Sequence, residues 1–262
     1  MTRAYDQETL AAALQAHGLE LPLHVFAQID STNDEARRRL SAGAPAWTVI
    51  VADEQTAGRG RLGCRWTSPP GAGVLMSVAL RPQIDPARLN RLTMLGAVAA
   101  LRALRRWFPP EAVSLKWPND VLLRGRKVAG VLPEAVFVGE MFAGAVLGVG
   151  VNVNGDFSAD PDLAGRATSM AEVWGAPLDR AEVLAALLAH LWEAYPALAH
   201  DDLFTAWRDA LAMLGAPVTV TTPGGALSGV AESVDRDGAL WLRTDAGERV
   251  RLLAGDVSLR AR

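Results

Sequence analysis

The chain has 262 residues, of which half are hydrophobic, and its formal net charge is −3. This length fits one large domain, or one large domain with a small domain beside it, and the weak negative charge argues against bulk binding to nucleic acid. The sequence contains no apolar run of the ~18 residues that span a bilayer and no signal-peptide pattern, so we expect a cytoplasmic protein without a membrane or nucleic-acid partner.

The first predicted elements are one helix and one strand. Asp6 is placed to cap a helix that ends at Gly18, and a strand is expected from Leu23 to Ile29. A helix-turn-helix DNA reader needs at least two helices, so no such domain is expected before this strand.

A second helix begins in the run DSTNDEARRRL. Both Ser31 with Asp34 and Thr32 with Glu35 have the spacing of a capping box. A buried strand is expected next, over residues 47–53.

The segment from Glu54 to Gly73 is rich in glycine, arginine and proline. Loops of this length are usually functional or disordered. In its AGRGRLG run, Arg59 and Arg61 alternate with glycines, which suits an anion such as phosphate, although a flexible basic loop is the other interpretation. The run is neither a Walker A loop nor a dinucleotide fingerprint.

Strands dominate the middle of the chain. A strand over 74–82 precedes Asp85-Pro86, which marks the start of a helix that runs to about Phe108 and is ended by Pro109-Pro110. Four strands follow, in VSLKW, DVLLR, KVAGVLPEA and FAGAVLGVGVNV, with tight turns such as Arg124-Gly125 between them.

Polar residues interrupt these strands at KWPND. Pro118 implies a strand break, and an exposed turn is one interpretation of the polar tip. The alternative places an amide and a carboxylate at a site mouth, where Asn119 could bind a base or ribose and Asp120 could hold Mg²⁺. Lys127 precedes an apolar strand, a position where most lysines are solvated.

Two further features concern the run GVGVNVN and the tryptophans. Glycine within a strand often marks close approach of a ligand, and Asn152 needs a hydrogen-bond partner if it is buried. Trp66, close behind the basic loop, is the best candidate to stack on a ligand. Cys64, the only cysteine, excludes an intrachain disulfide and has no activating neighbour, so we interpret it as a bystander.

The last part of the chain changes character. Helical patterns fill 169–174 and 180–214, and from about Gly215 short Val- and Thr-rich strands alternate with turns, which is typical of a small barrel. We therefore divide the chain into 1–214 and 215–262.

The motifs together resemble the biotin protein ligases. DSTND, DEQTAGRGRLGCRWTSPPGAGVLMS, KWPNDVLL, RKVAGVLPE and GVGVNVN follow this family's order and approximate spacing over about Phe26 to Asn154. The resemblance implies an α+β fold: a class II aminoacyl-tRNA synthetase-like mixed sheet flanked by helices, plus a small C-terminal SH3-like barrel. It implies activation of biotin by ATP with Mg²⁺, then transfer to a lysine of a biotin carboxyl carrier protein domain, and a possible homodimer.

The same resemblance assigns roles to the motif residues. The residues at the biotin end are Ser31, Thr32, Asn33 and Gln55. The loop over the acyl-phosphate contains Arg59, Gly60 and Arg61, and Lys127 is the cation at the reacting carboxylate and phosphate. Trp66 is implied near the adenine, Asn119 and Asp120 near nucleotide and metal, and Gly150 and Asn152 along the pocket wall.

Two residues depart from the family pattern. Cys64 stands where many relatives have a basic residue, and Pro133 interrupts a strand that usually has no proline. Three other functions remain open at this point: a lipoate or octanoate ligase of the same fold, a biotin-responsive DNA regulator, and a non-catalytic binding module built on the C-terminal barrel.

Overall fold

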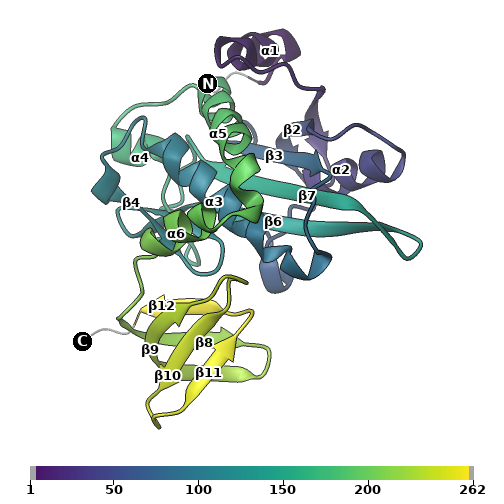
Figure 1. Ribbon diagram of the computed structural model, residues 1–262. Helices are drawn as coiled ribbons and strands as arrows, with labels where there is room; N and C mark the ends of the chain where they lie inside the picture. Colours follow the sequence, from purple (N-terminus) through teal and green to yellow (C-terminus); the bar gives the residue numbers. More distant parts are fainter. Residues whose placement is uncertain (1–3, 260–262) are drawn as a thin grey trace.

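Two β-sheets organise the protein, and the computed structural model describes residues 4–259 (Figure 1). The large sheet contains β1 (Leu23–Ile29), β2 (Thr48–Gln55), β3 (Gly73–Leu80), β4 (Val113–Lys116), β5 (Asp120–Leu123), β6 (Arg126–Val138) and β7 (Met141–Asn152). The small sheet contains β8 (Pro217–Thr222), β9 (Gly225–Val234), β10 (Leu240–Thr244), β11 (Arg249–Leu252) and β12 (Asp256–Leu259). The α-helices are α1 (Gln7–Ala16), α2 (Thr32–Ser41), α3 (Asn90–Leu104), α4 (Met170–Trp174), α5 (Arg180–Ala194) and α6 (Asp201–Asp209).

The large sheet is mixed, with the strand order β1-β2-β3-β7-β6-β5-β4, and the small sheet has the order β11-β10-β9-β8-β12. β1 and β2 are parallel, whereas the other neighbouring strands of the large sheet are antiparallel. The expected mixed sheet flanked by helices, with a small C-terminal β unit, is therefore confirmed.

Helices cover both faces of the large sheet because alternate residues of its strands point to opposite faces. Val49 and Val51 of β2 join the main hydrophobic cluster with α3, α5 and α6, whereas Ile50 packs with Ala36 and Leu40 of α2 on the other face. None of the helices within residues 4–259 is long and apolar enough to cross a membrane.

The N-cap residue of α2 is Ser31. The Ser31 hydroxyl accepts a hydrogen bond from the Asp34 N–H and the helix starts at Thr32. Of the two candidate capping positions, the structure therefore uses Ser31.

Two helix predictions were wrong in their extent. α3 ends at Leu104 rather than near Phe108, and a separate 3₁₀ turn over Pro86–Arg88 precedes it. The helical pattern over 180–214 is broken by a 3₁₀ turn, Tyr195–Ala199, between α5 and α6. Pro196 lies in that turn, and proline has no N–H to continue an α-helix.

Pro133 does not interrupt its strand, so that expectation was also wrong. β5 pairs with β6 only as far as Gly130, and Pro133 lies beyond this point, paired with Leu147 of β7. One edge of β6 is open there, so no neighbouring strand needs the missing N–H.

The small sheet contacts the end of the large sheet near β4. The Trp117 indole N–H donates to the Gly238 carbonyl at 2.8 Å, and the Lys116 ammonium pairs with Asp256 at 2.9 Å. Buried residues of both sheets belong to one hydrophobic cluster. The boundary at residue 215 stays a prediction.

Candidate active site

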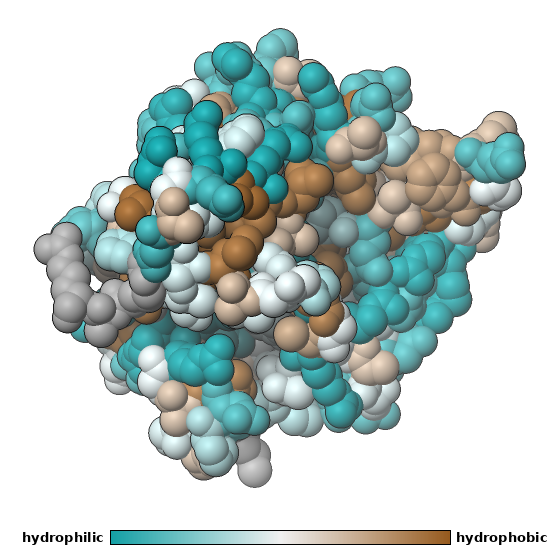
Figure 2. Space-filling view, turned by 90° about the horizontal axis from the view of Figure 1, so that it is seen from below, coloured by the Kyte–Doolittle hydropathy of each residue, from teal (hydrophilic) through white to brown (hydrophobic). Residues whose placement is uncertain are grey.

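A cavity of about 780 Å³ lies between the large sheet and the small sheet. Seen from below, this side of the molecule is hollowed near its centre, with hydrophobic residues beside hydrophilic ones (Figure 2). Except for Asn152, every residue that the motifs predict for the site lines this cavity. Motifs far apart in the sequence therefore converge on one site.

Polar groups at the start of α2 form one end of the cavity. The Thr32 N–H and hydroxyl both donate to Gln55 Oε1, at 2.7 and 3.0 Å. Because a backbone N–H can only donate, the Gln55 amide oxygen must face Thr32. The Gln55 Nε2 group makes no hydrogen bond with the residues that the structure describes, so it is available to a ligand.

Ser77 lies behind this end of the cavity, in contact with Thr32 and Asn33, and no motif pointed to it. It lies on β3 and is completely buried, with its hydroxyl 2.8 Å from Thr32 Oγ1 and 2.6 Å from Asn33 Oδ1. Gly148 of β7 makes room for Asn33, because a Cβ atom there would lie 2.2 Å from Asn33 Oδ1. A serine within an apolar strand was the available signal for Ser77.

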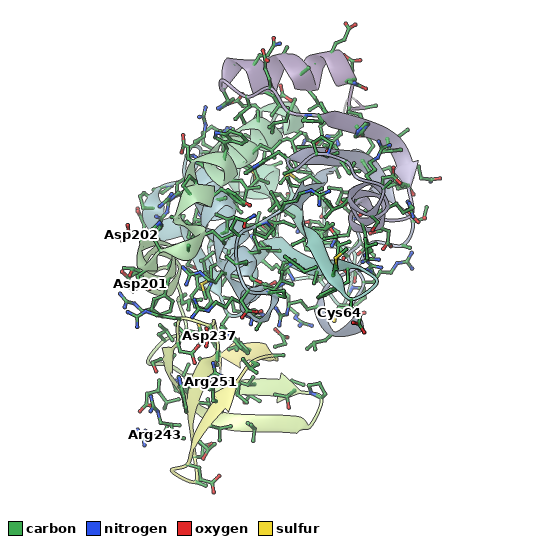
Figure 3. The ribbon with its side chains drawn as sticks, turned by 45° about the vertical axis from the view of Figure 1, so that its right-hand side comes forward. Cys64, Asp201, Asp202, Asp237, Arg243 and Arg251 are labelled. Carbon is green, nitrogen blue, oxygen red and sulfur yellow. The ribbon has the colours of Figure 1, made fainter. Side chains whose placement is uncertain are left out.

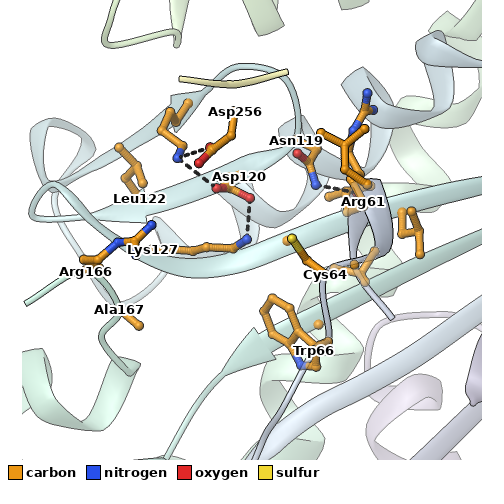
Figure 4. A pocket seen from close by; sticks show the side chains of 18 of the residues that line it. Arg61, Cys64, Trp66, Asn119, Asp120, Leu122, Lys127, Arg166, Ala167 and Asp256 are labelled. Atoms are coloured by element: carbon orange, nitrogen blue, oxygen red, sulfur yellow. Dashed lines mark hydrogen bonds and ion pairs between the residues drawn. The ribbon is translucent and has the colours of Figure 1, made fainter. Parts of the chain in front are cut away.

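A row of alternating charges crosses the other end of the cavity (Figure 4). Lys127 Nζ lies 2.7 Å from Asp120 Oδ1, and Lys116 Nζ lies 3.4 Å from Asp120 Oδ2. Asp256, from β12 of the small sheet, pairs with Lys116 in turn. Burial opposes the charge of Lys116, but the two carboxylates outweigh it and raise the pKa of that ammonium.

The two arginines of the basic segment, which is the glycine- and arginine-rich stretch of residues 54–73, have different surroundings. Arg59 pairs with Asp34 and Glu134, each at 3.0 Å. The Arg61 guanidinium makes no hydrogen bond or ion pair with any residue from 4 to 259, although its backbone carbonyl accepts from the Cys64 N–H. Burial lowers the pKa of Arg61, and the Asp120 carboxylate partly opposes this shift. Arg61 is therefore a half-buried cation without a close counter-ion, which favours binding of an anion.

Trp66 packs on two glycines of the large sheet. A Cβ atom at Gly150 would lie 2.5 Å from the indole ring, and one at Gly130 would lie 3.0 Å from it. Lys127 Nζ is 5.5 Å from the ring centroid. The indole N–H is buried without a partner among the described residues, so it is left for a ligand or water.

Asn119 and Asn152 donate to backbone carbonyls. The Asn119 amide donates to the Val131 carbonyl at 2.9 Å from within the cavity lining. Asn152 is buried and donates to the Thr168 carbonyl at 3.1 Å. The expected place of Asn152 on the pocket wall was wrong, because its amide faces the 168 backbone instead.

The segment around Arg166 also lines the cavity and carried no recognisable motif. It lies beside Lys127, whose N–H donates to the Arg166 carbonyl at 2.9 Å. Arg166 is exposed and adds a positive charge to this side. Cys64 is exposed at the cavity and makes no ion pair among the described residues.

Asp120 is the one predicted metal ligand. Both of its oxygens face lysines, and residues 4–259 contain no group of three or more His, Cys, Asp or Glu that could hold a metal. Mg²⁺ fits this site with one carboxylate only if phosphate oxygens and water complete its octahedral shell.

Both parts of the chain match known ligase families. Residues 25–152 match the biotin/lipoate A/B protein ligase family, and residues 213–260 match the biotin protein ligase C terminal domain. The biotin–[acetyl-CoA-carboxylase] ligase of Mycobacterium tuberculosis is 38% identical over 252 residues, which cover 90% of this chain and 88% of that protein. The corresponding ligase of Paracoccus denitrificans is 36% identical, over 86% of this chain and 96% of that protein.

Solved structures agree with these sequence relatives. The biotin protein ligase of Aquifex aeolicus in complex with biotin and ATP superposes with a TM-score of 0.76 at 29% identity, over 92% of this chain and 99% of that one. The chain belongs to the biotin protein ligase family, and its small sheet is the SH3-like C-terminal unit of that family.

Proposed function

We propose that this protein activates biotin with ATP to biotinyl-5'-AMP and transfers the biotinyl group to a lysine of a biotin carboxyl carrier domain. The observation that carries the proposal is the cavity itself, which has the uncommitted Gln55 Nε2 group at the α2 end and the cations Arg61 and Lys127 at the other. Biotin has a polar ureido edge at one end and a carboxylate at the other, and both ends meet suitable partners in this cavity.

The first step joins two anions. An oxygen of the biotin carboxylate attacks the α-phosphorus of ATP, a P–O bond to pyrophosphate breaks, and a mixed anhydride forms. Arg61 and Lys127 reduce the repulsion between the reactants and stabilise the charge of the transition state. Positioning and electrostatics therefore account for the catalysis.

The nucleotide and metal positions follow from the remaining residues. Trp66 and Asn119 border the space for the adenosine moiety. Asp120 is the carboxylate that would contact a Mg²⁺ ion, which would supply further charge neutralisation at the ATP phosphates. The Asp120 contacts with Lys116 and Lys127 keep this carboxylate in place.

In the second step the acceptor lysine, as a neutral amine, attacks the carbonyl of biotinyl-AMP. The amide bond forms, the bond to AMP breaks and the amine loses a proton. Water would hydrolyse the same anhydride, so the basic segment has to cover it.

The finer features of the partners are also proposals. The acceptor is a carrier domain in the cytoplasm, and neither nucleic acid nor a membrane is a partner. The open edge of β6 supports a homodimer, as do the exposed apolar residues Phe137 and Met141 on the projecting β6–β7 hairpin (Figures 1 and 2).

Ligand choice tests the proposed function directly. Calorimetry with biotin and with lipoate should show clear binding of biotin and weak or no binding of lipoate, because the free Gln55 Nε2 group can donate to the ureido oxygen of biotin, whereas the ring end of lipoate has no such acceptor. Transfer of labelled biotin to a carrier domain should require ATP. Binding of lipoate in preference to biotin would establish the alternative, a lipoate ligase of the same fold.

A second prediction concerns the small sheet. In Asp256→Asn, Lys116 keeps Asp120 as its counter-ion and attracts it more strongly. The ion pair between Asp120 and Lys127 is therefore weakened. We expect adenylate formation to slow by about two- to fivefold, the effect of one half-exposed ion pair. Asp237→Asn is the matched control, since Asp237 is equally exposed and pairs with Arg251 on the same sheet (Figure 3). Equal rates for the two variants would rule out this link.

A further inference from the structure

A closed network of two arginines and two carboxylates lies beside the α2 end of the cavity. Arg59 Nη1 donates to Asp34 Oδ2 and Arg59 Nη2 to Glu134 Oε2, both at 3.0 Å. Arg37 bridges the same two carboxylates, at 2.7 Å to Asp34 and 3.0 Å to Glu134. The four side chains are between 22% and 39% exposed, so the network is partly shielded from solvent.

Glu134 also contacts a ligand-facing residue. Its Oε2 atom accepts a hydrogen bond from Asn33 Nδ2 at 2.5 Å. The amide nitrogen is thereby held toward β6, and Oδ1 is turned toward Ser77. The same Nδ2 group lies 3.3 Å from the Leu132 carbonyl, so Glu134 supplies the shorter of the two contacts that hold the Asn33 amide nitrogen.

The same carboxylate attaches the basic segment to the rest of the protein. Burial opposes the charge of Arg59, but Glu134 and Asp34 outweigh it and raise the pKa of the guanidinium. Arg59 is thus a committed cation, unlike Arg61. The backbone around it forms a short closed turn, in which the Gly60 N–H donates to the Cys64 carbonyl and the Trp66 N–H to the Gly58 carbonyl.

We propose that Glu134 is a positioning residue that orients Asn33 for the ligand and, through Arg59, holds the basic segment against α2 and β6. The proposal rests on the proposed function for the identity of the ligand. Arg59 then acts as the anchor of the segment, and Arg61 is left to bind the phosphate. One carboxylate connects the ureido end of the site to the segment that covers the anhydride.

Two variants of Glu134 grade the loss of its contacts. Glu134→Gln keeps an oxygen at the Oε2 position for Asn33, but it removes the negative charge and places an amide NH2 group at the Oε1 position, against Arg59 and Arg37. Glu134→Ala removes all of these contacts. Glu232→Gln is the matched control, because Glu232 also lies on a strand, is 30% exposed and pairs with two arginines, Arg243 and Arg249, on the small sheet. Arg243 projects from the small sheet far from Cys64 of the basic segment (Figure 3).

The measurements are biotin affinity by calorimetry and hydrogen exchange at the Gly60 and Trp66 amides. For Glu134→Ala we expect biotin affinity to fall about tenfold, as for one lost hydrogen bond to a charged group, and exchange at both amides to accelerate. For Glu134→Gln we expect faster exchange with biotin affinity within about threefold of the parent. Glu232→Gln should change neither quantity.

The outcomes distinguish this inference from the proposed function. If the parent protein binds no biotin, the proposed function fails, and the exchange data alone decide whether Glu134 holds the segment. If the parent binds biotin but both Glu134 variants match it in affinity and exchange, the positioning role is wrong. If Glu134→Ala does not fold, the exchange rates of Glu134→Gln decide the case.

Discussion

Replacing Lys127 by alanine is expected to slow adenylate formation by about 10²–10³-fold, the usual effect of removing one group that stabilises transition-state charge. Asp120 holds the Lys127 ammonium at 2.7 Å within the cavity lining, where the carboxylate and the α-phosphate have to meet. Pyrophosphate release in a single turnover measures the step directly, before any transfer to an acceptor.

The fold should tolerate the loss of Lys127. Asp120 keeps Lys116 as a cation, so we expect the melting temperature to fall by only about 2–4 °C, which corresponds to about 1 kcal/mol in a protein of this size. Arg126→Ala is the control, because the neighbouring Arg126 pairs with Glu172 outside the cavity. Parental rates of adenylate formation in Lys127→Ala, or loss of its fold, would contradict a role at the reacting centre.

Arg61→Gly is expected to release the adenylate. Ordering the basic segment over the product costs roughly 1 kcal/mol or more per residue, and charge-assisted bonds from Arg61 to the phosphate help to offset this cost. Without them the segment should open more often. We expect the dissociation rate of biotinyl-AMP to rise at least tenfold, with little change in biotin affinity, and exposed lysines of added proteins to become biotinylated without specificity.

A control for backbone freedom accompanies this variant. Leu62→Gly makes the same segment more flexible at a position that is 54% exposed, but it removes no charge. It should retain the adenylate much longer than Arg61→Gly does. If Arg61→Gly holds the adenylate as long as the parent, or if exchange in residues 54–73 is slow without ligand and unaffected by it, the covering role of the segment is wrong.

The sequence by itself predicted most of the helices and strands and the family. The cap at Ser31, the strand break at Pro118 and the turn at Arg124-Gly125 were predictable because each depends on a few neighbouring residues. The order and spacing of the motifs identified the family and a set of site residues, all but one of which line the cavity.

Which partner each side chain has was decided only by the tertiary structure. Arg59 pairs with Glu134, and Lys116 with Asp256, across 75 and 140 residues of sequence. The place of Ser77 and the contact of the Asn152 amide with the Thr168 carbonyl likewise depend on which strands are neighbours. Alternation along a strand shows which residues share a face, but the register of packed elements decides which of them meet. For this reason the sequence predicted Arg59 and Arg61 as equivalent cations, whereas packing neutralised Arg59 and left Arg61 free of any close carboxylate among the described residues.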